Sequence, residues 1–214
     1  HGTLIANDKS KGVTWLLDLA TRTFRSVELP LVAGNHETAV SVDGSTVAVP
    51  HYEYVTEKGQ SEGGASPGHG VSLIDLKTGL PSFLAAQSNP FGNPKPHHAV
   101  WLEDGSLITT AQVSNGFVKY TPNGTSLAIA IDPAACNTPH LIRLVPESRL
   151  AVSGCRCTNA GCKDSPGHPG GNGSVVVFDV DTFAWKALPM GPASEGITVT
   201  GNGDVWVGSN VKDG

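Results

Sequence analysis

Charged residues are scarce in this chain, at 15% of 214 residues, whereas glycine and proline are plentiful, at 26 and 15 residues. This balance predicts many turns and few surface helices. The net charge of −5 argues against nucleic acid as a partner. No apolar run is long enough to span a membrane and no signal peptide is recognisable, so we expect no membrane partner. The length suits a single domain over residues 1–214.

Motifs of several enzyme classes are also missing. No glycine-rich loop follows a strand and opens a helix, which argues against a nucleotide site. No Gly-x-Ser-x-Gly elbow and no paired-carboxylate spacing of a glycosidase stands out. The chemistry of this chain must therefore be sought in other residues.

Alternating apolar and β-branched runs, separated by turn signals, cover nearly the whole chain, and no segment has a clear helical period. We therefore predict an all-β protein built from repeated four-stranded antiparallel units. The expected strands are residues 38–42, 46–49, 71–76 and 82–86, then 99–102, 106–110, 117–120 and 126–131, then 141–145, 149–153, 174–180 and 184–188. Repeated four-stranded units of this size are typical of a β-propeller.

One strand signature recurs three times and ends each time in an aspartate, at Val13–Asp18, Val71–Asp75 and Val175–Asp179. The aspartate is expected to open a turn by accepting hydrogen bonds from the backbone that follows it. Together with Ala39-Val-Ser-Val-Asp-Gly44, the segment Val71-Ser-Leu-Ile-Asp-Leu-Lys-Thr-Gly79 resembles the YVTN-type propeller repeat. The resemblance implies a fold and no particular activity, because propellers carry many unrelated functions.

The repeat is uneven at its ends. The first unit lacks its innermost strand, and the last stops after a first and a second strand, at residues 197–200 and 205–208. We count four to five blades, compatible with part of a seven-bladed ring. The domain is therefore expected to be incomplete at one or both ends.

Four aligned segments begin with an ionisable residue in the same place. These residues are His36, His97, His140 and Glu195, and each stands eight residues before a turn residue, which is Gly44, Gly105, Ser148 or Gly203 in the same order. Because a repeat fixes geometry, the four side chains are expected to converge on one axis. Three imidazoles and one carboxylate predict a site for a divalent metal, and Zn²⁺, Mn²⁺, Fe²⁺ and Cu²⁺ all tolerate this set.

Two alternatives to this ligand set stay open. Propellers similar to the YVTN type often carry a Pro-His pair at the start of the innermost strand. There the imidazole can form a hydrogen bond to a neighbouring backbone group instead of binding a metal. In addition, Glu37, His98 and Leu141 form the next column, which points the opposite way on a strand. Because that second column mixes different residue types, the column of His36, His97, His140 and Glu195 is favoured as the one that points to the axis. A register shift of one residue would instead replace two of these ligands by Glu37 and His98.

Strand direction places further candidates at the same end of the repeat. His51 ends a second strand, Tyr52 follows it, and His69 and His168 lie in the matching motifs Ser66-Pro-Gly-His69 and Ser165-Pro-Gly-His168. We predict these four residues as general acids or bases above the metal, because imidazoles titrate near neutral pH.

The function predicted from these residues is a metal-dependent enzyme of lyase, hydrolase or oxygenase type that acts on a small molecule or a saccharide. The arrangement is similar in outline to propeller lyases that hold a metal with axial histidines, such as oligogalacturonate and virginiamycin B lyases, and to the four-histidine iron of carotenoid oxygenases. The alternative is a non-catalytic binding or scaffold propeller that recognises a protein, peptide or glycan. The sequence leaves the oligomeric state open.

Four cysteines gather late in the chain, at Cys136, Cys155, Cys157 and Cys162. Two disulfides that fix long loops are the preferred interpretation, ahead of a zinc site or free thiols. The sequons at Asn123 and Asn172 add weak support for export. We therefore expect a secreted or periplasmic protein.

Overall fold

A computed structural model describes residues 2–29, 34–52, 70–85, 95–157, 172–192 and 194–209, and every regular element in these ranges is a strand. The chain divides into two compact units, which are described separately below. The first comprises His1–Thr109 and Lys119–Leu127, and the second comprises Thr110–Val118 and Ala128–Gly214. Within the described ranges, no helix has the length and hydrophobicity needed to cross a membrane.

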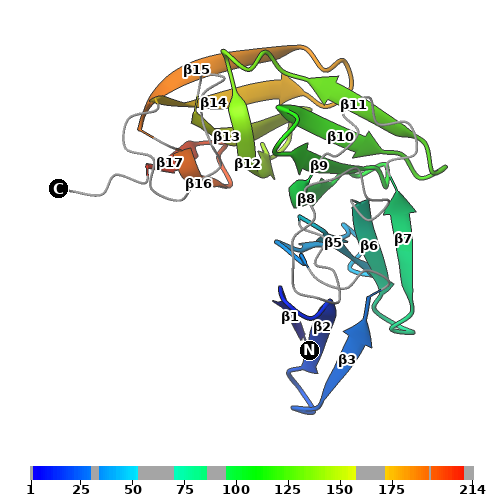
Figure 1. The fold of residues 1–214 in the computed structure, drawn as a ribbon. Coiled ribbons are helices and arrows are strands. Elements are labelled where there is room, and N and C mark those ends of the chain that lie inside the picture. Colours follow the sequence, from blue (N-terminus) through cyan, green and yellow to red (C-terminus); the bar gives the residue numbers. More distant parts are fainter. Residues whose placement is uncertain are drawn as a thin grey trace. The chain divides into compact units, whose positions relative to one another are not determined.

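The first unit contains two complete antiparallel sheets (Figure 1). One has three strands in the order β1 (Thr3–Asp8), β2 (Val13–Asp18) and β3 (Phe24–Glu28). The other has four, in the order β4 (Ala39–Val40), β5 (Thr46–Pro50), β6 (Gly70–Asp75) and β7 (Pro81–Ala85). Their facing side chains form one core cluster of Leu16, Val27, Leu29, Val47, Val49 and Ile74. Apolar burial on facing sheets is the main stabilising term of such a pair.

The next sheet has the order β11 (Ser126–Ala130), β10 (Gly116–Tyr120), β9 (Leu107–Ala111) and β8 (Pro96–Trp101). Of its strands, β8 lies wholly in the first unit, and it is the strand that carries His97.

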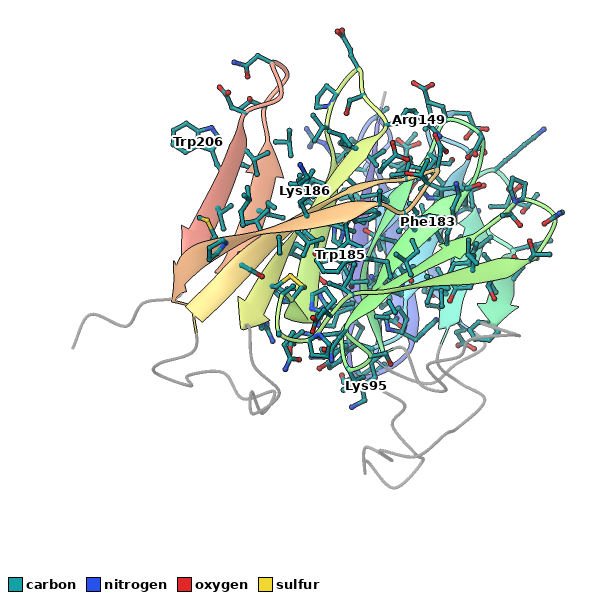
Figure 2. The ribbon with its side chains drawn as sticks, turned by 90° about the horizontal axis from the view of Figure 1, so that it is seen from above. Lys95, Arg149, Phe183, Trp185, Lys186 and Trp206 are labelled. Carbon is teal, nitrogen blue, oxygen red and sulfur yellow. A yellow bond between two sulfur atoms is a disulfide. The ribbon has the colours of Figure 1, made fainter. Side chains whose placement is uncertain are left out.

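The second unit contains a further four-stranded sheet, in the order β12 (Asn137–Leu144), β13 (Leu150–Cys157), β14 (Asn172–Asp179) and β15 (Trp185–Pro192). A two-stranded sheet follows, formed by β16 (Ser194–Val199) and β17 (Val205–Ser209). Val152, Val175 and Ile197 join these two sheets in one core cluster. On β17, Trp206 projects into solvent (Figure 2).

The predicted four-stranded antiparallel units are confirmed, and so are the turns after the repeated signature. The Oδ1 atom of Asp75 accepts hydrogen bonds from the backbone N–H and hydroxyl of Thr78, at 2.7 and 2.9 Å. The Oδ1 atom of Asp179 does the same with Thr182, at 2.7 and 3.0 Å. Aspartate suits this position because its short side chain can accept hydrogen bonds from the backbone N–H groups that follow it.

The innermost strands differ from the prediction in where they begin. The strand expected to start at residue 99 begins at Pro96, and the one expected at residue 141 begins at Asn137. The strand expected at residues 38–42 shrinks to Ala39–Val40. His97 and His140 therefore lie inside strands, whereas His36 precedes its strand.

One of the two predicted disulfides is confirmed, between Cys136 and Cys155, with 5.3 Å between the Cα atoms. The side chain of Cys157 and all of Cys162 lie outside the described residues, so the second disulfide stays a prediction. The bond ties Cys136, directly before β12, to Cys155 in β13, the neighbouring strand of the same sheet.

Replacing both cysteines, as Cys136→Ser with Cys155→Ser, is expected to lower the free energy of unfolding by about 3 kcal/mol, the amount typical of a loop of this size. The reason is that the bond closes a loop with a sequence separation of 19 residues, which restricts the unfolded chain. Urea denaturation of both proteins measures the difference. Reductant should destabilise the wild type by at least as much as the double substitution does, and equal stability in all three samples would contradict the prediction.

Candidate metal centre

The segment that carries His36 and Glu37 is fixed by hydrogen bonds to its neighbours rather than by a sheet of its own. The backbone N–H of His36 donates to the carbonyl of Pro50 at 2.9 Å. The carbonyl of His36 accepts from Nδ2 of Asn7 at 2.6 Å, and the Oδ1 atom of Asn7 accepts from Thr14 at 2.8 Å. The backbone at residue 36 is thus held from both β1 and β5, which sets the direction of its imidazole.

His97 comes to the same place from β8. It is the second residue of that strand, and its side chain is only 5% exposed. Four residues later, Nε1 of Trp101 donates to the carbonyl of Ala39 in β4 at 3.1 Å. This bond fastens β8 beside β4, so His97 is placed against the segment that precedes β4.

His36, Glu37 and His97 form a cluster in which one ligand atom from each residue lies within 4.8 Å of the others. The Oε2 atom of Glu37 accepts a hydrogen bond from Nδ1 of His36 and lies 2.9 Å from Nδ1 of His97. The two imidazole centroids are 3.6 Å apart. Two imidazoles and one carboxylate therefore converge on a single point.

The electrostatics of the cluster keep Glu37 ionised. Burial of the side chain acts to raise its pKa, but hydrogen bonds from His36 and His97 and the charges on those rings outweigh it, so the pKa of Glu37 lies well below its usual range. A carboxylate that stays anionic is the form that binds a metal. At 40% exposure, Glu37 also leaves the cluster open to solvent on its side.

Tyr52 packs against both imidazoles. Its ring makes edge-on contacts with His36 at 5.5 Å and with His97 at 5.4 Å between centroids. Its backbone N–H donates to the carbonyl of Gly34 at 2.8 Å. This predicted residue is therefore brought to the cluster, and its catalytic role stays a prediction.

His51 is placed elsewhere. Its Nε2 atom lies 2.7 Å from the hydroxyl of Ser72, both residues are buried, and the ring stands 6.2 Å from that of Phe83. The structure thus gives His51, directly after β5, a hydrogen bond to Ser72 of β6 and does not include it in the cluster. Its catalytic role stays a prediction, and His69 and His168 lie outside the described residues.

The other two predicted ligands belong to the second unit. His140 lies in β12 with Nε2 at 2.8 Å from Nη2 of Arg156, and Glu195 lies in β16. Because a guanidinium only donates, Nε2 of His140 accepts and its proton is on Nδ1. The roles of His140 and Glu195 as metal ligands stay predictions.

The expectation that Glu37 points away from His36 is wrong. Side chains alternate between faces only within a strand, and residues 36–38 precede β4 instead of belonging to it. The adjacent side chains of His36 and Glu37 can therefore turn toward the same point. His98, the other residue of that second column, is buried in β8 and is not a member of the cluster.

No protein-family model matches the sequence, and no curated protein matches it. Solved structures do match. Hydrazine synthase of Kuenenia stuttgartiensis has a TM-score of 0.71 at 14% identity, with 94% of this chain and 50% of that chain covered. Virginiamycin B lyase from Staphylococcus aureus has a TM-score of 0.68 at 13% identity, with 97% of this chain and 59% of that chain covered.

The fold is a β-propeller. A third match, the extracellular domain of a one-component system from B. thetaiotaomicron, has a TM-score of 0.63 at 12% identity and covers 96% of this chain and 23% of that chain. The first two names are those of enzymes, and this chain spans only about half of each. At these identities the likeness concerns the propeller fold alone, so the chemistry must come from the side chains of this chain.

Proposed function

We propose that this propeller is an enzyme that binds one divalent metal ion through His36, Glu37 and His97 and acts on a small molecule or a saccharide. The observation that carries the proposal is the convergence of three ligand atoms within 4.8 Å. The donor set fits Zn²⁺, Mn²⁺, Fe²⁺ or Cu²⁺, because imidazole and carboxylate ligands suit all four.

The number of ligands favours catalysis over a structural role. Structural zinc sites in proteins hold four protein ligands, whereas catalytic sites hold about three and keep a position for water or substrate. A metal bound here would polarise a carbonyl or lower the pKa of a bound water. Partial exposure of Glu37 provides a side from which a substrate can approach.

Tyr52 is the residue best placed to assist. Its ring contacts both imidazoles and is itself buried, so it fixes their orientation and excludes water from one side of the cluster. A phenol next to bound substrate can also donate a proton to a leaving group, as general acid. We assign Tyr52 this role in a lyase or hydrolase reaction.

A binding propeller is the second candidate, and one observation favours it. Trp15 and Phe24 form an edge-on aromatic pair with centroids 5.6 Å apart on β2 and β3, and Phe24 is 69% exposed. Exposed aromatic pairs of this kind suit a protein, peptide or glycan partner.

We also propose that the protein is exported to an oxidising compartment, secreted or periplasmic. The disulfide between Cys136 and Cys155 supports this, because such bonds persist mainly outside the cytosol.

The direct test is the metal content of protein purified without an affinity tag. We expect about one divalent ion per chain in the wild type, and Glu37→Gln should weaken metal affinity at least about tenfold, because the amide removes an anionic ligand. Elemental analysis after dialysis and a competition titration with a chelator measure the two quantities.

Glu28→Gln is the matched control, because Glu28 is an exposed carboxylate on β3 outside the cluster. Its metal content and affinity should equal those of the wild type. Wild-type protein that neither retains a metal nor binds one at micromolar concentration would contradict the proposed enzyme.

A further inference from the structure

Two lysines converge on Tyr52, the residue that packs on the proposed metal ligands. The Nζ atom of Lys95 lies 5.5 Å from the centroid of the Tyr52 ring, and Nζ of Lys9 lies 5.9 Å from it. Both distances fall within the roughly 6 Å over which a ring face attracts an ammonium group. The ring of Tyr52 therefore contacts two ammonium groups as well as the imidazoles of His36 and His97.

The two lysines reach this place from separate segments, each tied to a metal-binding segment. Lys9 lies in the turn between β1 and β2, and its carbonyl accepts from Gly34, two residues before His36, at 2.8 Å. Lys95, which is labelled in Figure 2, immediately precedes β8 and stands two residues before His97. Any rearrangement of either ligand segment would therefore move a lysine as well.

Lys95 also has a backbone conformation that lysine seldom adopts. Its φ is 41°, in the left-handed region that costs energy for a residue with a Cβ atom. Such conformations persist only where the surrounding structure imposes them, and they gather at binding sites. The conformation directs the chain from Lys95 into β8 while its ammonium stays over Tyr52.

The sign of the charge indicates the ligand. The whole chain carries a net charge of −5, yet two ammonium groups gather around Tyr52. Glu37 would neutralise only one charge of a divalent ion, so the metal, Glu37 and the two lysines together would carry a net positive charge. Positive charge focused at a partly buried site selects anions and speeds their arrival.

We propose that the substrate of this site carries a carboxylate, which binds to the ammonium groups of Lys9 and Lys95 around Tyr52 while the rest of the molecule reaches the metal position. The inference rests on the proposed metal-dependent function and adds the substrate class to it. Lys95 is half-buried and Lys9 is exposed, so Lys95 provides the larger share of the binding, because exposed ion pairs contribute little.

The experiment compares succinate with succinamide, its neutral amide analogue, by calorimetric titration of the zinc-loaded protein. We expect succinate to bind and succinamide to bind at least about tenfold more weakly, because charge-assisted contacts are roughly twice as strong as neutral ones. Lys95→Met should weaken succinate binding about tenfold, and Lys9→Met by a smaller factor of about three.

Two controls accompany these variants. Lys77→Met removes an exposed lysine from the β6–β7 turn, away from the cluster, and should leave succinate binding unchanged. Lys95→Arg keeps the charge and should restore most of the affinity that Lys95→Met loses. If Lys95→Met failed to fold, Lys9→Met would still report the dependence on charge.

The outcomes separate the two proposals. Protein that retains zinc but binds succinate equally well in wild type, Lys9→Met and Lys95→Met would overturn the carboxylate inference and leave the metal enzyme standing. Equal binding of succinate and succinamide would do the same. Protein that binds no zinc would overturn the proposed function, and the inference with it.

Discussion

His97→Ala should release the metal from this protein, with affinity reduced at least about 100-fold. The expectation follows because loss of groups that merely orient a ligand already costs about 10–100-fold, and His97 is itself a member of the cluster. A chelator competition titration measures the loss. The side chain is buried beside His36 and Tyr52, so His97→Gln, which keeps a polar group of similar length, serves as the second variant if alanine unfolds the protein.

The same titration on His140→Ala and Glu195→Ala decides between two ligand sets. The repeat predicts His36, His97, His140 and Glu195, whereas the structure brings together His36, Glu37 and His97. We expect His140→Ala to retain the metal, because the Arg156 guanidinium beside its ring repels a second cation. A loss of metal in His140→Ala as large as in His97→Ala would instead establish the four-residue set.

Phe178→Ala should lower the free energy of unfolding by about 3–5 kcal/mol, the range found when a buried phenyl ring is removed. Phe178 is 1% exposed and stacks on Phe117 with ring centroids 4.5 Å apart, so its removal leaves a cavity that no neighbour fills easily. Urea denaturation at neutral pH measures the effect.

Phe24→Ala provides the matched comparison, since it deletes the same ring from an exposed position. Its effect should stay below about 1 kcal/mol, as for most surface changes. Equal effects of the two substitutions would contradict the described packing of Phe178. Phe178→Ala should also retain as much metal as the wild type. That result would show that the stability of the second unit and metal binding in the first unit are independent.

The repeated strands could be predicted from the sequence because each signal is local. The segment Val71–Asp75 combines β-branched and apolar residues with a turn aspartate, and the structure places it in β6. The segments before and after it also combine β-branched and apolar residues with turn residues. The strands favoured by the local sequence are therefore the same strands that pair in the sheet. The start of β12 is harder to predict, because Asn137 pairs with Cys157 of β13 beyond a register shift between Pro139 and Ile142, where strict alternation of side chains is interrupted.

Two of the three cluster residues could be predicted from the sequence and the third could not. His36 and His97 stand out because the repeat aligns them, and the structure brings them together. Alternation along a strand predicts the wrong face for Glu37, because this residue precedes β4 instead of belonging to it. The sequence signal for Glu37 is its position directly after His36, which puts two metal-binding residue types side by side. Lys9 and Lys95 had no sequence signal, since only the tertiary fold brings them to Tyr52.

The turn aspartates of the repeat have a consequence for acid tolerance. Backbone and hydroxyl hydrogen bonds hold the pKa of Asp18, Asp75 and Asp179 below the usual range, and that of Asp43 at about 2. A depressed carboxyl pKa adds stability above the unfolded-state pKa of about 3.9, and that stability is lost as pH falls further. Because Asp18, Asp75 and Asp179 end β2, β6 and β14, acid is expected to weaken the turns of these three sheets over one common pH range. The repeat therefore also distributes a small acid sensitivity, limited by the exposure of these carboxylates, over three sheets.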